Sequence, residues 1–172
     1  MESIQRKAIG SAVALLVTTL CATAQQPATS YNKVSDITYA VVDDRELGLD
    51  IYMPRGVDDP PLLVWIHGGR WLYRTKEDIN TLALVEEGFA IASIDFRLSV
   101  DEPFPAQIHD IKAAIRFLRA NAETYGYEAT RIGVHGRSSG GHLTSLVGVT
   151  NGVKELEGEL GDHLDVSSDV QV

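Results

Sequence analysis

The sequence reads Arg131-Ile-Gly-Val-His-Gly-Arg-Ser-Ser-Gly-Gly-His-Leu143 where a short apolar run passes through a glycine-flanked serine into a second apolar run. Gly136, Ser138 and Gly140 form the pattern G-x-S-x-G. Where a strand turns sharply into a helix, the middle residue of this pattern projects from the turn, and the glycines remove Cβ atoms that would collide there. The pattern therefore predicts an exposed nucleophilic hydroxyl on Ser138. Because so short a pattern also arises by chance, its flanks decide its meaning.

The chain on either side of this stretch alternates between strand patterns and helix patterns. Residues 62–66 form a continuous apolar run, typical of a strand covered on both faces, and further strands are predicted at residues 89–96 and 132–135. Helix patterns follow them in turn. Alternation of this kind predicts a parallel sheet with crossover helices in one α/β domain.

The three predicted helices differ in the signals that define them. Thr75 and Asp78 resemble a capping box that opens a helix ending at Gly88. Ser139 to Val149 forms a second helix directly after the serine. The strongest helix places its apolar residues three and four positions apart, at Ile108, Ile111, Ile115 and Leu118.

The N-terminal part of the predicted sheet departs from this parallel pattern. Residues 37–42 and 47–53 alternate apolar and polar side chains about the turn-like Asp43-Asp44-Arg45, which predicts an antiparallel hairpin. Residues 166–172 are expected to begin a further strand. The predicted fold is therefore a mostly parallel α/β sheet with an N-terminal antiparallel hairpin.

Length and charge limit the classes of partner. A chain of 172 residues is typical of one domain, and its formal net charge of -9 argues against nucleic acid, whose phosphates attract basic surfaces. The acidic residues near the C-terminus lack the regular spacing of a calcium loop. We therefore expect no metal and no cofactor, and the sequence does not indicate an oligomeric state.

Residues 1–24 have the pattern of a secretory signal peptide. Arg6 and Lys7 precede an apolar run over residues 9–20, and Ala22-Thr23-Ala24 supplies a small-residue cleavage site. The run is shorter than the roughly 20 residues that cross a bilayer, so a membrane anchor fits less well. A lipid-anchored start at Cys21 is a further alternative, although bulky Leu20 precedes this cysteine.

The expected mature protein is secreted or periplasmic, with no membrane association after cleavage near Ala24. Residues 25–34 are expected to be a disordered tail, and residues 35–172 the folded domain. Because Cys21 is the only cysteine, stability cannot depend on disulfides in the mature chain.

A second glycine-rich stretch, His67-Gly-Gly-Arg70, follows the strand at residues 62–66. Ligands of α/β sheets bind outside the carboxyl ends of the strands, where both glycine-rich stretches are predicted to lie. Backbone N–H groups of Gly68, Gly69 or Arg70, together with that of Ser139, could form an oxyanion hole beside Ser138.

Six stretches carry a resemblance to a known family: Leu49-Asp-Ile-Tyr52, Val64-Trp-Ile-His-Gly-Gly69, Ile94-Asp-Phe-Arg-Leu98, Phe104-Pro-Ala-Gln107, Lys112-Ala-Ala-Ile-Arg-Phe-Leu-Arg119 and the serine stretch itself. In this order they resemble the hormone-sensitive-lipase-like esterases of the α/β-hydrolases, and most of all the bacterial feruloyl and acetyl-xylan esterase-like branch. The resemblance implies that His67 is a structural histidine that supports the oxyanion loop. Two departures are Arg70 in place of the third glycine of H-G-G-G, and Ser139 in place of alanine.

In this family a catalytic acid and then a histidine follow the serine, on loops after later strands. We expect neither in this chain, which resembles an N-terminal portion whose C-terminal strands are missing. His142 lies four residues along the helix of Ser138 and is expected to pack, and His163 is expected in a solvated loop. His109 and His135 precede the serine and are interpreted as structural.

Other polar and aromatic residues are given structural roles. Asp95 and Arg97 are expected to form a pair that braces neighbouring loops rather than to act in catalysis. Trp65 is expected in the core, whereas Trp71 could line an acyl pocket. Two further carboxylates are interpreted as charges of a helix surface or a loop: Asp110 and Glu128.

The first functional hypothesis is a secreted carboxylic-ester hydrolase, or a fragment of one, that acts through a Ser138 acyl-enzyme. The resemblance implies acetyl or feruloyl esters of plant polysaccharide, or small-molecule esters, as substrates. An aryl formamidase or a serine peptidase would share this mechanism. The alternative from another class is a secreted non-catalytic protein that keeps the half-fold as a binding surface.

Overall fold

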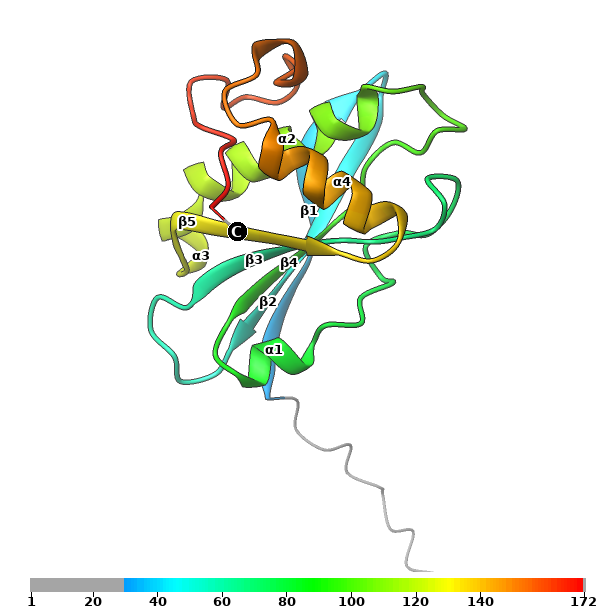
Figure 1. Ribbon diagram of the computed structural model, residues 1–172. Coiled ribbons are helices and arrows are strands. Elements are labelled where there is room, and N and C mark those ends of the chain that lie inside the picture. Colours follow the sequence, from blue (N-terminus) through cyan, green and yellow to red (C-terminus); the bar gives the residue numbers. More distant parts are fainter. Residues whose placement is uncertain (1–29, 172) are drawn as a thin grey trace, which may run out of the picture.

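A computed structural model of the protein describes residues 30–171 (Figure 1). The signal peptide predicted over residues 1–24 and its cleavage site lie outside the described residues. The disordered tail predicted over 25–34 is wrong for Tyr31 to Val34, because these residues belong to the first strand.

Five strands form one mixed sheet in the order β1-β2-β4-β3-β5. The pairs β1·β2 and β2·β4 are antiparallel, and the pairs β3·β4 and β3·β5 are parallel. The sheet is thus evenly mixed rather than mostly parallel. The strands are β1 Tyr31–Val42, β2 Arg45–Pro54, β3 Pro61–Ile66, β4 Ala90–Ile94 and β5 Glu128–Gly136.

The predicted hairpin is confirmed, with Val42 paired to Arg45 across a two-residue turn. Both turn residues have positive φ, 48° at Asp43 and 64° at Asp44. Turns of this kind match the twist of the paired strands, and aspartate tolerates positive φ better than most side chains.

Helices cover both faces of the sheet, as Figure 1 shows: α2 and α4 lie on one side and α1 on the other. The larger core lies under α2 and α4, and the smaller one joins Val85 of α1 to Trp65 and Tyr52. The position predicted for Trp65 is therefore confirmed. The helical segments are α1 Ala83–Glu86, α2 Ala106–Ala120, α3 Ala122–Tyr125, α4 Ser139–Val149 and the short 3-10 turn η1 Lys154–Leu156.

The helix predicted over residues 75–88 is mostly wrong, because only Ala83–Glu86 is helical. The capping contact exists, since Thr75 N donates to the Asp78 carboxylate over 3.2 Å, but it closes a turn. Lys76 explains the difference: its N–H donates to Asp95 at 2.7 Å and its C=O accepts from the Ser93 hydroxyl at 2.6 Å. The C=O of Lys76 is the acceptor that the first turn of such a helix would need, and the bond from Ser93 occupies it.

The strand predicted over residues 166–172 does not form within the described part, which ends at Gln171. The N–H and C=O of Val170 bond to the side chain of Asn151, at 3.1 and 2.9 Å, instead of to a neighbouring strand. Gln171 N does donate to Ile132 O of β5, at 3.1 Å. The segment therefore lies along β5 without becoming a strand.

Cationic side chains of α2 hold the chain that follows α4. Lys112 is fully buried, and its Nζ donates to Thr150 O at 2.7 Å and to the Glu157 carboxylate at 2.6 Å. Arg116 donates to Glu157 O at 3.0 Å and to Leu160 O at 2.9 Å. The acidic segment at residues 151–165 is thus bound to the core through α2 and is not simply a solvated loop.

Replacing Glu157 by glutamine is expected to lower the free energy of unfolding by about 2 to 3 kcal/mol, because it leaves the buried Lys112 ammonium without its counter-charge. Burial opposes the charged form of Glu157, yet hydrogen bonds from Lys112 and Ser168 hold the pKa of its carboxyl below the ordinary value. Urea unfolding followed by tryptophan fluorescence measures the loss.

Glu155→Gln is the matched control, because it removes the same charge two residues earlier, from an exposed side chain. Its effect is expected to stay within about 0.5 kcal/mol. Equal unfolding midpoints for the two variants would mean that Lys112 does not depend on Glu157. In the unchanged protein, the pair of Lys112 and Glu157 is expected to add to the free energy of unfolding at any pH above the pKa that Glu157 has in the unfolded chain. This stabilisation is lost as the pH falls through the lower pKa that Glu157 has in the folded protein.

Candidate active site

Ser138 occupies the sharp turn between β5 and α4 with φ 58° and ψ -120°. This strained backbone leaves the residue exposed at the head of the helix. A Cβ on Gly136 would lie 2.6 Å from Ile66 O, and one on Gly140 would lie 2.1 Å from the same oxygen. Both glycines of the pattern are therefore required by the close approach of β3, as expected for a nucleophile elbow.

The second glycine-rich loop leaves the end of β3 beside this turn. Gly69 has φ 107°, and its carbonyl accepts from Leu72 N at 2.9 Å and Tyr73 N at 3.2 Å. A Cβ on Gly68 would lie 2.7 Å from Arg137 O and 3.5 Å from the Ser138 Cβ. The two loops are thus packed backbone against backbone, which brings the glycine-rich loop beside Ser138.

A cavity of about 200 Å³ brings Ser138 together with most of the predicted oxyanion residues. Ser139 is the first residue of α4, so its N–H belongs to the helix end that lacks intrahelical partners and carries the positive end of the dipole. Arg70 keeps φ 58° although it replaces a glycine. The residues around the cavity are Gly68, Gly69, Arg70, Tyr73, Arg74, Asn80, Arg137 and Ser138.

His67 lies beneath this loop, buried and stacked on Phe96 with ring centroids 4.4 Å apart. Its Nδ1 is 2.8 Å from Gly68 O. Burial lowers the pKa of His67, which favours a neutral ring that donates from Nδ1 to that carbonyl. This contact fixes the carbonyl of Gly68 and fits the supporting role that the resemblance implies.

Among residues 30–171, no histidine borders the Ser138 cavity. His142 packs edge-on against Trp71, with ring centroids 5.5 Å apart, and both line a different cavity of about 290 Å³. Trp71 is therefore outside the cavity of Ser138. The ring of His135 packs against that of Trp65, tilted by 60° with centroids 4.9 Å apart, and its Nε2 lies 3.2 Å from the Thr81 hydroxyl, which is a structural position.

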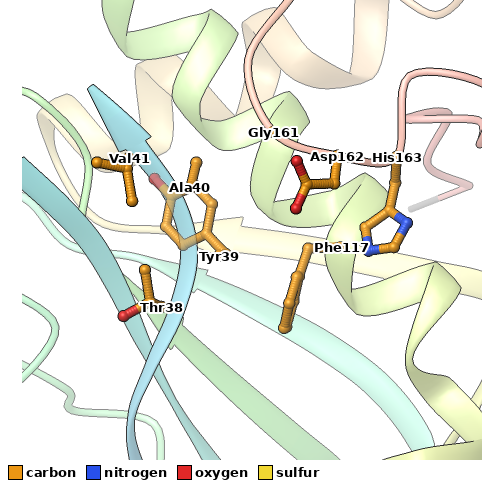
Figure 2. A pocket seen from close by; sticks show the side chains of 8 residues that line it. All are labelled: Thr38, Tyr39, Ala40, Val41, Phe117, Gly161, Asp162 and His163. Atoms are coloured by element: carbon orange, nitrogen blue, oxygen red, sulfur yellow. The ribbon is translucent and has the colours of Figure 1, made fainter. Parts of the chain in front are cut away.

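His163 borders another cavity, of about 280 Å³, between β1, α2 and the loop at residues 161–163. Figure 2 shows its ring beside Phe117, with Tyr39 and Ala40 of β1 on the far side. Its Nε2 lies 3.4 Å from the Asn121 amide. None of the residues that line this cavity also lines that of Ser138.

The predicted pairing of Arg97 with Asp95 is wrong. Arg97 binds Asp110 instead, with Nη2 2.6 Å from the carboxylate, and Asp110 also accepts from Arg97 N at 2.8 Å. Asp110 is fully buried, so its assignment as a surface charge is wrong too. Asp95 accepts from Lys76 N, and burial raises the pKa of its carboxyl. These groups brace the loops around the site.

An ion cluster around the buried side chains of Asp50 and Lys76, which the sequence patterns did not predict, joins β1 and β2 to the loop that precedes α1. Lys76 Nζ lies 2.8 Å from the carboxylates of both Asp50 and Asp36, and Lys33 Nζ lies 2.7 Å from Asp50. Although burial opposes its charge, these hydrogen bonds raise the pKa of Lys76. One signal was present: Asp50 interrupts the apolar stretch of β2, where an unpaired carboxylate would be costly.

No helix within residues 30–171 is long and apolar enough to span a bilayer. Over the same residues, no three His, Cys, Asp or Glu side chains come together in a group that could hold a metal ion.

The chain is similar to one protein family and to several esterases. Residues 49–172 match the BD-FAE family. Esterase LipC of Mycobacterium tuberculosis is 33% identical over 135 residues, which are 76% of this chain and 34% of LipC. A truncated form of carbohydrate esterase from gut microbiota superimposes with a TM-score of 0.76 at 36% identity, over 82% of this chain and 55% of that one.

A bifunctional GH43-CE protein of Bacteroides eggerthii superimposes with a TM-score of 0.74 at 41% identity. The match covers 81% of this chain and 22% of the other. The chain thus spans about a third of the length of LipC and between a fifth and just over half of these two solved chains.

Proposed function

Since the chain belongs to the BD-FAE family of α/β-hydrolases, we propose that it carries the nucleophile and oxyanion hole of a serine carboxylic-ester hydrolase. One observation carries the proposal. Ser138 stands in a strained turn at the head of α4 and shares one cavity with Gly68, Gly69 and Arg70. The esterase relatives support the same reaction class.

In the proposed reaction, Ser138 Oγ attacks the ester carbonyl carbon and gives up its proton to a general base. The negative charge that develops on the carbonyl oxygen is held by N–H groups of Ser139 and of the loop at Gly68 to Arg70. The alcohol leaves with a proton, and water then releases the acid from the acyl-enzyme. In the family the base and the acid follow later strands, and we assign neither to a residue within 30–171.

The proposed substrates are acetyl or feruloyl esters of plant polysaccharide. The support is the resemblance to carbohydrate esterases together with the motifs of the feruloyl and acetyl-xylan esterase-like branch.

The proposed location is outside the cytoplasm, supported by the charged start, the apolar run and the small residues that end at Ala24. N-terminal sequencing of exported protein is expected to begin at Gln25.

Covalent labelling tests the proposed nucleophile. The folded protein is incubated with a fluorophosphonate probe, digested and mapped by mass spectrometry. We expect a single adduct on Ser138, because Ser139 is buried and Ser145 donates its hydroxyl to Gly141 O at 3.0 Å. An adduct on another serine would refute the assignment. A folded chain that stays unlabelled would mean that these residues alone do not activate Ser138, which the alternative, a secreted binding protein that retains the fold without the chemistry, also predicts.

A further inference from the structure

The cavity of Ser138 is cationic although the chain as a whole carries a formal net charge of -9. Three arginines line it, Arg70, Arg74 and Arg137, and none of its lining residues is acidic. Its other side chains are neutral hydrogen-bonding groups, including those of Tyr73 and Asn80. The N-terminal end of α4 adds a partial positive charge beside Ser138. A negatively charged ligand therefore meets an attractive potential here that the overall charge does not supply.

Two of the three guanidinium groups have no carboxylate partner in the described part of the chain. Arg74 is 3.1 Å from the Asp78 carboxylate, so its charge is partly neutralised. Within residues 30–171, neither Arg70 nor Arg137 forms an ion pair. Both are exposed at the cavity, where their donors remain free for a ligand.

The two arginines lie on the two loops that form the cavity of Ser138. Arg70 follows Gly69 in the oxyanion loop, and Arg137 directly precedes Ser138 in the elbow. The loops are pressed together, since a Cβ on Gly68 would come within 2.7 Å of Arg137 O. Because the two loops are packed tightly together, both arginines are held at the cavity that Ser138 lines.

We propose that this cavity selects esters that carry a carboxylate close to the scissile bond, and that Arg70 and Arg137 bind this carboxylate. Arginine presents a planar fork of donors that matches the two oxygens of a carboxylate. The carboxylate takes no part in bond breaking and serves only to place the ester at Ser138. Acidic sugars that are acylated on a hydroxyl group and keep a free carboxylate have this chemistry. The inference rests on the proposed function, because it names the esters that Ser138 would attack. The preference for a carboxylate ligand can nevertheless be measured by binding, without turnover.

The test compares two ligands of the same shape and different charge, 4-hydroxybenzoate and 4-hydroxybenzamide. Each is titrated into the whole protein by calorimetry at low ionic strength, where charge contributes most. We expect the carboxylate to bind about 10-fold more tightly than the amide. A ratio below about twofold would overturn the proposal.

Paired variants locate the preference. In the double variant Arg70→Gln with Arg137→Gln the ratio is expected to fall to about one, and Arg70→Lys with Arg137→Lys is expected to restore part of it. The matched control, Arg131→Gln with Lys154→Gln, removes two exposed charges outside the cavity and is expected to keep the full ratio. A preference that survives the first pair, or that disappears equally in the control, would contradict the proposal. Unfolding midpoints establish that each variant is folded.

Fluorophosphonate labelling separates this inference from the proposed function. Labelling at Ser138 without a carboxylate preference would overturn the inference and leave the esterase proposal standing. A carboxylate preference that depends on Arg70 and Arg137, in a folded chain that is never labelled, would support the inference and show that these residues alone do not activate Ser138.

Discussion

The rate at which a fluorophosphonate labels the protein is expected to fall at least about 10³-fold when Ser138 is replaced by alanine. The reason is geometric: Ser138 supplies the hydroxyl at the cavity shared by the elbow and the oxyanion loop. The neighbouring N–H groups remain in the variant, but they stabilise charge on a reacting centre that no longer has a nucleophile to attack it. Labelling is followed by intact-protein mass as a function of time.

Ser145→Ala is the matched control, because it removes a hydroxyl from the same helix without touching the cavity. Its labelling rate is expected to equal that of the unchanged protein. Alanine adopts the strained φ of Ser138 no more easily than serine does, so the two variants are expected to unfold at similar urea concentrations. Persistent labelling of Ser138→Ala on a second residue would show that the probe does not report this site.

Local sequence patterns predict the elements that meet at the active site. Glycines at fixed spacing around Ser138, between an apolar run and a helix pattern, predict the elbow because the collision they relieve is local to that turn. The pair Asp43-Asp44 predicts the hairpin for a similar reason, since both residues must take positive φ. The predicted oxyanion loop then follows from placing two glycine-rich stretches at the same end of one sheet.

Patterns of this kind miss structure that is held by distant charges. Lys76 lies in a segment with a helical pattern, yet its ammonium binds Asp50 and Asp36, which lie 26 and 40 positions earlier in the chain. Lys112 binds Glu157, 45 positions later. Patterns among neighbouring residues do not indicate partners so far away in the chain. Burying either lysine costs free energy, so each requires such a partner.

The cationic cavity has a similar origin. Arg70 stands out in the sequence as a departure from the family pattern, but Arg137 looks like a variable position of G-x-S-x-G. Only the packing of the two loops places both beside one cavity. Specificity at this site is therefore expected to depend on side chains that the motif leaves undefined, while the motif itself fixes the position of Ser138.

Replacing Gly140 by alanine is expected to lower the free energy of unfolding by more than about 4 kcal/mol. The new Cβ would lie 2.1 Å from Ile66 O and 2.5 Å from His67 O. Both atoms belong to the backbone, so no side chain can rotate away, and relief requires that α4 separate from the end of β3. That separation would also move the oxyanion loop, and labelling of Ser138 is expected to be lost even in the fraction that remains folded.

Gly148→Ala provides the contrast within the same helix, because nothing lies within 4 Å of a Cβ at that position. Alanine favours the helical backbone more than glycine does, so this variant is expected to gain up to about 1 kcal/mol. Urea unfolding of the two variants therefore separates the general effect of glycine in a helix from the close contact at the elbow. If Gly140→Ala proved as stable as Gly148→Ala and kept its labelling rate, the tight packing of α4 against β3 would not be what positions Ser138.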